Sequence, residues 1–308
     1  MKKIIAIILA LATLIGCAAA LSSCGGGSDF TVGICQLAVH PSLDQATAGF
    51  TDALEAKMAE AGKTVTVNLQ VAGEPDLCTT VVNTFVAQDV DLIMANATPA
   101  LLAAANATSK IPVLGTSVTD YLDTFGGNIP ENVSGTSDAV PFDDQASMMI
   151  SSLGLVRGDL VGVIYCSNES NSVIQYNAVK ALFESQGINV KAYTFSETTE
   201  LQAITESAAA ECRAIYVPSD NTVAQNDAAV ATICSRESIP VFTSYGGEIC
   251  YASLAIDYYM LGYETGLMAA EILLSGKAPK DIAIKTLTPT VVYNEKICEE
   301  LGIEIPEN

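Results

Sequence analysis

The chain contains no tryptophan and a single histidine, His40. One imidazole excludes zinc sites built on two or more histidines, and no nucleophile motif stands beside it. The sequence also lacks a G-x-G-x-x-G loop after a strand, a G-x-S-x-G turn and a P-loop. Without a catalytic base, a metal cluster or a phosphate loop, the sequence predicts no enzyme, no metal and no cofactor.

Basic residues are scarce. The chain has 14 lysines and arginines against 35 aspartates and glutamates, which gives a formal net charge of −21. A surface this acidic repels the phosphates of nucleic acids, so no nucleic-acid partner is expected. The acidic residues are scattered along the sequence, which is typical of a plain hydrated surface.

Cysteine pairs with a recognisable spacing are also lacking. None of the nine cysteines forms a C-x-x-C motif, and seven remain once the amino-terminal Cys17 and Cys24 are set aside. An odd number cannot pair completely, and the cysteines form no cluster with the single histidine. The pattern therefore indicates neither a zinc site nor a disulfide framework, but small buried hydrophobic residues.

The amino-terminal end has the pattern of an export signal. A basic start precedes an apolar run over residues 4–21. The run ends in a Leu-Ser-Ser-Cys segment that resembles a lipobox, which predicts that Cys24 becomes the lipidated first residue after a signal peptide of residues 1–23. A glycine-rich linker then leads to the folded body from residue 30. Cys17 ends a second such segment, but cleavage there would leave residues 18–21 as an apolar tail. We expect an extracytoplasmic protein, anchored to the outer face of the cell membrane.

Two similar series of elements follow one another along the chain, which is longer than one hydrophobic core usually serves. Short β-branched runs alternate with helical stretches, and the strands are apolar enough to be covered on both faces of a parallel sheet. The first series covers residues 31–37, 43–61, 64–71, 76–88, 92–95, 99–108 and 113–115, and the second covers 143–153, 160–165, 172–186, 189–195, 199–210, 214–217, 223–235 and 241–243. The pattern predicts an α/β protein with two Rossmann-like parallel-sheet lobes.

The last fifty residues are too few for a third domain. They predict a strand at 254–256, a helix at 259–274, a strand-like run at 282–292 and a short helix at 295–301. We assign residues 30–138 and 253–285 to the first lobe and residues 139–252 and 286–308 to the second. Three crossings then form a hinge that permits closure, and Asp138 at the first crossing is expected to hold the hinge by hydrogen bonds.

The loops after the strands are rich in hydroxyl and amide side chains. In parallel α/β sheets these loops, at the carboxyl ends of the strands, hold the ligand. They cover residues 36–41, 96–99, 116–120, 166–172, 218–222 and 244–247. Short polar side chains and helix amino-terminal amides suit a small polar ligand that carries a carboxylate.

Five segments, at residues 36–44, 91–99, 162–165, 215–223 and 257–266, resemble the substrate-binding lipoproteins of a tryptophan/tyrosine-type ABC transporter family. The most specific is the Tyr-Val-Pro-Ser-Asp-Asn-Thr run at 216–222. The resemblance extends through nearly the whole mature chain. It implies the type I periplasmic-binding-protein fold, no enzymatic activity, a permease with its ATPase as partners, and an amino-acid-like ligand, aromatic in the first place.

The loops and the resemblance together give a set of candidate ligand-binding residues. We expect Asp220 or Asp257 to pair an ammonium, helix-start amides with nearby hydroxyls and amides to bind a carboxylate, and Tyr245 with the loop 37–41 to form an apolar wall. Asn96, Thr98, Asp220, Asn221 and Asp257 have the alternative role of helix caps, and His40 that of a surface residue. The full set is Gln36, His40, Pro41, Asn96, Thr98, Thr116, Ser117, Ser167, Asn168, Ser170, Asn171, Asp220, Asn221, Tyr245 and Asp257.

Two alternatives remain open at the level of sequence. A ligand-sensing ectodomain of a membrane receptor would bind its ligand in the same way as a transport protein. The modest aromatic content also leaves room for an aliphatic amino acid or another small polar solute. In each case the chain is expected to act as a monomer.

Overall fold

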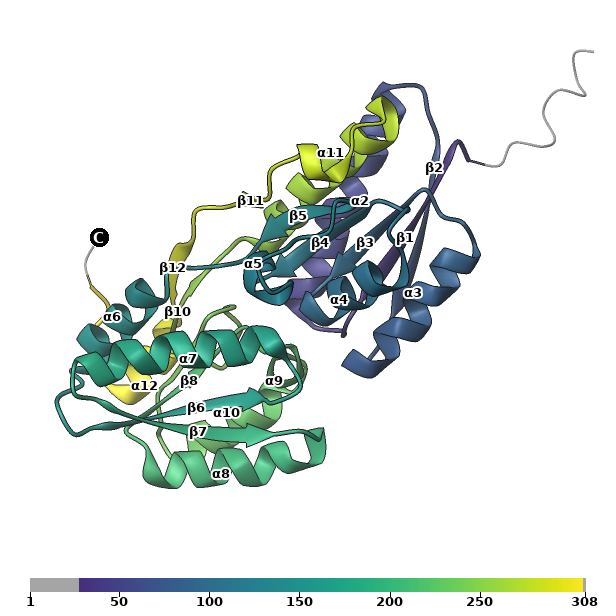
Figure 1. Cartoon of the computed structure of the whole chain (residues 1–308). Coiled ribbons are helices and arrows are strands. Elements are labelled where there is room, and N and C mark those ends of the chain that lie inside the picture. Colours follow the sequence, from purple (N-terminus) through teal and green to yellow (C-terminus); the bar gives the residue numbers. More distant parts are fainter. Residues whose placement is uncertain (1–27, 307–308) are drawn as a thin grey trace, which may run out of the picture.

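The computed structural model describes residues 28–306 and consists of two lobes, each built on a six-stranded sheet (Figure 1). The strand order is β11-β5-β4-β3-β1-β2 in the first sheet and β12-β10-β9-β8-β6-β7 in the second. All pairs are parallel except β10 with β12. The predicted α/β class with two parallel-sheet lobes is confirmed.

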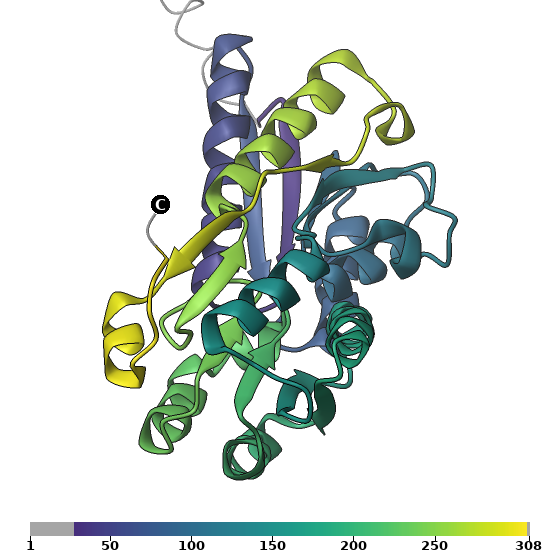
Figure 2. The same cartoon turned by 90° about the vertical axis from the view of Figure 1, so that its left-hand side faces the viewer.

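The first lobe has helices on both faces of its sheet, α2 and α11 on one and α3 and α4 on the other (Figures 1 and 2). This is why β3 and β4 are buried along their whole length. The elements are β1 (Phe30–Gln36), α2 (Pro41–Glu60), β2 (Val65–Val71), η1 (Pro75–Leu77), α3 (Cys78–Ala87), β3 (Leu92–Asn96), α4 (Thr98–Ala107), β4 (Val113–Val118), α5 (Tyr121–Thr124), β5 (Val133–Ser137), α11 (Tyr258–Ser275), η3 (Pro279–Asp281) and β11 (Lys285–Thr286).

Helices α2 and α11 pack with their backbones in direct contact, although they are 200 residues apart in sequence. Glycines make this approach possible: a Cβ at Gly49 would overlap the carbonyl oxygen of Tyr259, and one at Gly262 would overlap that of Ala46. Phe50 and Met268 fill the layer between these helices and the sheet. The glycine contacts therefore fix α11, which returns to the first lobe after most of the second lobe has been formed.

The substitution Gly262→Ala is expected to lower the free energy of unfolding by about 1–3 kcal/mol, because the added methyl group meets backbone that cannot rotate away. Urea unfolding of the purified protein measures the loss. Met260→Ala, at an exposed position of the same helix, is the matched control and should change stability by less than about 0.5 kcal/mol. Equal stability of Gly262→Ala and the wild type would refute the close packing of α2 on α11.

The second lobe repeats the layered plan, with α6 and α7 on one side of the sheet and α8 and α10 on the other (Figure 1). Its centre is aromatic: the Tyr216 ring stacks on Phe242 with centroids 5.9 Å apart, and the Tyr216 hydroxyl donates to Gln145 Oε1 at 2.6 Å. The elements are α6 (Phe142–Leu153), β6 (Leu160–Cys166), α7 (Ser170–Ser185), β7 (Asn189–Phe195), η2 (Thr198–Glu200), α8 (Leu201–Glu211), β8 (Ala214–Val217), α9 (Asn221–Gln225), α10 (Asp227–Arg236), β9 (Val241–Thr243), β10 (Ala252–Ala255), β12 (Thr290–Tyr293) and α12 (Glu295–Leu301).

The structure corrects part of the predicted division of the chain. We assigned residues 253–285 to the first lobe, but β10 pairs with β9 and β12 and so belongs to the second sheet. The run predicted as one strand at 282–292 is two short strands, β11 in the first sheet and β12 in the second. Residues 133–137, for which no strand was predicted, form strand β5. Its small polar residues are buried by neighbouring strands and α11, so hydrophobicity did not reveal it.

No helix within residues 28–306 combines the length and the apolar character needed to cross a membrane. The predicted lipidation site, Cys24, and the signal segment lie outside the described residues. The seven cysteines within them, Cys35, Cys78, Cys166, Cys212, Cys234, Cys250 and Cys298, are all buried and free, as expected of small core residues.

A candidate ligand site between the lobes

A small cavity lies between the two lobes, where the carboxyl ends of both sheets face each other. Only about 10 Å³ of its volume is open to water, which is room for about one molecule. The lobes are thus closed upon each other in this structure. The lining residues are His40, Leu43, Ser117, Asp138, Ser219, Asp220, Asn221, Ala224, Tyr245 and Tyr258.

Two hydrogen bonds join the lobes beside the cavity. His40 Nε2 lies 3.2 Å from Asn221 Oδ1, and Gln175 Nε2 donates to Thr119 Oγ1 at 3.1 Å. The Oε1 of Gln175 also accepts from the Ser219 amide at 3.0 Å, so this side chain links the first lobe to a cavity loop of the second. These contacts hold the closed arrangement of the lobes.

The second lobe contributes two buried carboxylates at the start of α9. Glu169 accepts from the Asn221 amide, the Asn221 side chain, the Thr222 amide and the Thr222 hydroxyl at 2.6 to 3.0 Å. Asp220 accepts from the Cys166 amide, the Ser172 hydroxyl and the Val223 amide. The amino terminus of α9 is therefore occupied by the protein's own carboxylates, and its amides are not available to a ligand carboxylate.

The Asp220 carboxyl has a pKa well above its ordinary value. Burial and the charge of Glu169 raise its pKa to about 8, against three hydrogen bonds that favour the ionised form. Asp220 or Asp257 was predicted to pair an ammonium. Asp220 does line the cavity, but both its oxygens are engaged within the second lobe. Its immediate role in this structure is to cap α9 and to connect it to β6 and α7.

Asp138 differs from Asp220 in having a free oxygen. Its Oδ2 accepts from the Tyr258 hydroxyl at 3.0 Å, while Oδ1 is buried without a partner. Burial raises the pKa of this carboxyl, and the hydroxyls of Tyr258 and of the nearby Thr119 oppose the rise. Asp138 thus links two of the three crossings, as the sequence analysis expected, and in addition lines the cavity with an unpaired acceptor. Sequence analysis missed this second role because Asp138 follows a strand that its polar composition concealed.

Three buried polar atoms of the cavity residues lack a partner: His40 Nδ1, Ser117 Oγ and Asp138 Oδ1. Buried polar atoms are normally paired, so such a cluster indicates groups that a ligand satisfies. The cluster also adjoins the start of α2, where His40 precedes Pro41 and no side chain caps the helix. Unsatisfied amides and the helix dipole favour an anion at that end.

The backbone beside the cavity is strained at two positions. Ala97, after β3, has φ 95°, and Ser117, near the end of β4, has φ 55°. Residues other than glycine adopt such angles at a cost, and they concentrate at functional sites. Both loops had been singled out for their position after a strand.

Two tyrosines and two aliphatic residues form the apolar part of the lining. The Tyr245 hydroxyl donates to Asp227 Oδ1 at 2.6 Å, so that its ring is anchored from outside the cavity. Tyr258 is held in the same way by Asp138. Leu43 from α2 and Ala224 from α9 complete these walls. Tyr245 was expected as an aromatic wall, whereas Tyr258 was not among the predicted ligand-binding residues.

Three of the predicted ligand-binding residues are engaged inside the first lobe. Gln36 bonds to Ala38 O, Asp44 and Thr47. The Nδ2 of Asn96 donates to Leu43 O and to Thr47, and the Thr116 hydroxyl lies 3.1 Å from that of Thr136. None of the three lines the cavity, because their side chains stabilise α2 and the sheet instead.

The remaining candidates lie around the cavity without lining it. Ser167 and Asn168 are exposed and donate to Phe195 O and Ser196 O, and Ser170 is exposed at the start of α7. Asp257 is exposed and caps α11 through the Met260 amide. The buried Thr98 Oγ1 and Asn171 Oδ1 have no partner. Pro41 borders a neighbouring groove of about 630 Å³ together with Asp257, Tyr245 and Tyr258.

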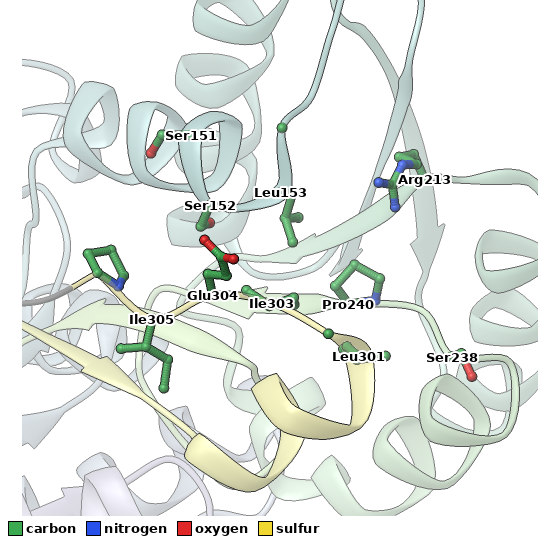
Figure 3. A pocket seen from close by; sticks show the side chains of 13 residues that line it. Ser151, Ser152, Leu153, Arg213, Ser238, Pro240, Leu301, Ile303, Glu304 and Ile305 are labelled. Carbon is green, nitrogen blue, oxygen red and sulfur yellow. The ribbon is translucent and has the colours of Figure 1, made fainter.

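A larger cavity, about 1000 Å³, lies in the second lobe (Figure 3). Arg213 and Pro240, which precede β8 and β9, place it at the amino ends of the strands, and residues 301–306 form its other wall. Ligands of parallel α/β sheets bind at the opposite ends. Within residues 28–306 no group of three or more histidine, cysteine or acidic residues could hold a metal ion.

Two hinged α/β lobes that enclose a small polar cavity define a two-lobed solute-binding protein. Residues 31–308 match the family of ABC transporter substrate binding proteins. The chain belongs to this family. A curated relative, the tyrosine-binding protein of Clostridioides difficile (strain R20291), is 34% identical over 287 residues, which cover 89% of this chain and 81% of that protein.

Two solved structures at about 30% identity are similar to this chain over most of its length. The ABC domain of Streptococcus pneumonia in complex with L-Trp is 31% identical, with a TM-score of 0.81 over 89% of this chain and 96% of the other. A ligand-free, open substrate binding protein of Clostridium difficile is 32% identical, with a TM-score of 0.66 over 91% and 97%. Identity and coverage are nearly equal in the two comparisons, and this chain superposes better on the complex with L-Trp than on the open, ligand-free structure.

These findings confirm four predictions: the type I periplasmic-binding-protein fold, a substrate-binding function, its link to an ABC transporter, and the expectation that the protein is not an enzyme. A substrate-binding protein of an ABC importer acts outside the cytoplasm, which agrees with the predicted extracytoplasmic location. The family match also favours transport over the alternative of a receptor ectodomain.

Proposed function

We propose that this substrate-binding protein delivers an aromatic amino acid to an ABC permease and its ATPase. The observation that carries the proposal is the cluster of unpaired polar atoms in a cavity whose other walls are Tyr245, Tyr258 and Leu43. A zwitterion with an aromatic side chain needs both kinds of surface. Relatives at 31% and 34% identity that bind L-Trp and tyrosine support the same ligand class.

The ammonium of the ligand is proposed to bind Asp138 Oδ1. This oxygen is a buried carboxylate acceptor without a partner. Burial raises the pKa of the Asp138 carboxyl, and the positive charge of an ammonium would stabilise its ionised form. The ligand carboxylate is proposed to lie at the uncapped start of α2, with the Ser117 hydroxyl as a further donor. The aromatic side chain then packs against Tyr245 and Leu43.

The lobes are proposed to open and close around the three crossings, near residues 138–141, 256–257 and 287–289. The cavity has room for about one water in this structure, so an amino acid must enter while the lobes are apart. The lobes or the lining side chains must then leave more room for it than they do here. A ligand that contacts both lobes stabilises the closed form by its differential affinity for it. The bonds from His40 to Asn221 and from Gln175 to Thr119 would form on closure.

Calorimetric titration of the purified folded body with each of the twenty amino acids tests the ligand. We expect tryptophan, tyrosine or phenylalanine to bind most tightly, with a dissociation constant in the micromolar range or below, about −8 kcal/mol. Aliphatic amino acids should bind more weakly, since they leave the aromatic wall uncovered. Binding of no amino acid more tightly than millimolar would refute the ligand class, while the family assignment would stand.

The protein is further proposed to be a monomer attached to the membrane by a diacylated Cys24. The lipobox-like segment before Cys24 and the glycine-rich linker after it support this attachment. Cys24→Ala is expected to move the protein from the membrane fraction to the soluble fraction or to the unprocessed precursor, measured by fractionation and immunoblotting. Release by Cys17→Ala and not by Cys24→Ala would show that the earlier cysteine is the lipidated residue.

A further inference from the structure

His40 is the only histidine of the chain, and it lies at the boundary between the lobes. It is 6% exposed and lines the ligand cavity. Its two ring nitrogens have different environments: Nε2 lies 3.2 Å from Asn221 Oδ1 of the second lobe, and Nδ1 is buried without a partner. Which nitrogen carries the proton therefore decides what His40 can offer to a ligand.

The orientation of the Asn221 amide is fixed from behind by Glu169. The Asn221 side-chain nitrogen donates to Glu169 Oε2 at 2.6 Å. The two oxygens of Glu169 accept from four donors of residues 221 and 222, as an ionised carboxylate does. A carboxylate only accepts, so the amide nitrogen of Asn221 must face Glu169, and its oxygen must face His40.

An amide oxygen also only accepts. The short contact with Asn221 Oδ1 therefore requires a proton on His40 Nε2. Burial lowers the pKa of His40, which favours the neutral ring, and the neutral ring then has no proton on Nδ1. The free Nδ1 is a hydrogen-bond acceptor in a cavity that also contains the free acceptor Asp138 Oδ1.

We propose that Glu169 and Asn221 lock His40 in its Nε2–H tautomer when the lobes close, so that Nδ1 accepts a hydrogen bond from the ligand ammonium. This inference rests on the proposed amino-acid ligand and assigns it a second ammonium acceptor beside Asp138. Glu169 and Asn221 are positioning residues: they act through the imidazole and make its acceptor available only in the closed form. A ligand without a donor at this point would leave Nδ1 buried and unpaired, at a cost in affinity.

Nitrogen-15 NMR of the protein labelled at histidine tests the tautomer directly, because a single residue gives the whole signal. The spectrum is recorded at about pH 8, above the ordinary pKa of histidine, with and without saturating L-tryptophan or L-tyrosine. We expect the bound form to show a protonated Nε2 and an unprotonated, hydrogen-bonded Nδ1. A proton on Nδ1 in the bound form would overturn the inference even if calorimetry shows tight binding. Absence of binding by every amino acid would overturn the proposed ligand, and the inference with it.

Variants test whether Asn221 acts on binding through the tautomer of His40 or only through the stability of the fold. Asn221→Ala should weaken binding about tenfold, the loss of one hydrogen bond to an ordered group, and in the bound form should give a mixture of the two tautomers. Asn189→Ala, at an exposed asparagine at the amino end of β7 in the same lobe, is the control and should change neither. His40→Asn keeps an acceptor near the position of Nδ1 and should bind more tightly than His40→Gln, which keeps only the contact to Asn221. Tighter binding by His40→Gln than by His40→Asn, or an unchanged tautomer in Asn221→Ala, would contradict the proposed control of the His40 tautomer.

Discussion

Asp138→Asn is expected to weaken the binding of an aromatic amino acid by about 100-fold or more. Removing one member of a buried charge pair costs about 3 kcal/mol or more, because the ammonium remains desolvated without its counter-charge. The fold should tolerate the change, since burial already disfavours the charged form of Asp138 and an amide oxygen can still accept from Tyr258. Calorimetric titration measures the affinity, and thermal unfolding without ligand checks the fold.

Two other aspartates serve as comparisons for this variant. Asp257→Asn changes an exposed helix cap that does not line the cavity, and its affinity should stay within about twofold of the wild type. Asp220→Asn disturbs three hydrogen bonds inside the second lobe, so its main effect should be on stability. A larger loss of affinity in Asp257→Asn than in Asp138→Asn would show that the ammonium binds Asp257, in the groove that borders the cavity at Tyr258.

Binding is expected to weaken by up to about tenfold per pH unit as the pH falls below the raised pKa of Asp138. Burial raises this pKa in the free protein, and a bound ammonium lowers it again, so binding releases a proton between the two values. Affinity is therefore constant above the raised pKa and falls below it. His40 acts in the same direction: its pKa is lowered by burial, and its protonation turns the Nδ1 acceptor into a donor. Titrations from about pH 8 downward measure the slope.

The variant Asp138→Asn is the control for this pH dependence as well. It should have a weaker affinity with a smaller slope, and the slope that remains would belong to His40 and to Asp220, whose pKa is raised to about 8. The cavity tyrosines, Tyr245 and Tyr258, have pKa values raised well above the ordinary value of 10 and do not titrate in this range. Tighter binding at acid pH would contradict the assignment of Asp138 to the ammonium.

The alternation of apolar strands and helices predicted the two parallel sheets because a strand covered on both faces has a continuous apolar sequence. The alternation did not reveal strands whose sequence is not continuously apolar. The strand β5 is a run of small polar residues whose hydroxyls bond to neighbouring elements, as Ser134 does to Ile282 O. The strand β10 follows β9 after a loop, and its pairing with the distant β12 could not be derived from local pattern.

Some of the residues predicted to bind the ligand line the cavity between the lobes, namely His40, Ser117, Asp220, Asn221 and Tyr245. Gln36, Asn96 and Thr116, at or near the ends of neighbouring strands, turn inward to stabilise their own lobe instead. The position of a residue at the end of a predicted strand indicates where its side chain lies but not which way the side chain points. Leu43, Asp138, Ser219, Ala224 and Tyr258 line the cavity but were not predicted to bind the ligand. Asp138 and Glu169, to both of which the structure gives a role at the site, are buried acids. Glu169 could have been noticed as the one acidic residue in the loop 166–172.

A crystal structure of the protein with L-tryptophan tests the central claim most directly. We predict that the amino acid lies between the lobes, that its ammonium nitrogen is within hydrogen-bond distance of Asp138 Oδ1 and His40 Nδ1, and that its carboxylate is at the start of α2. The indole should pack against Tyr245. A ligand bound outside the cavity between the lobes, or an ammonium paired with Asp220 or Asp257 instead of Asp138, would contradict this account.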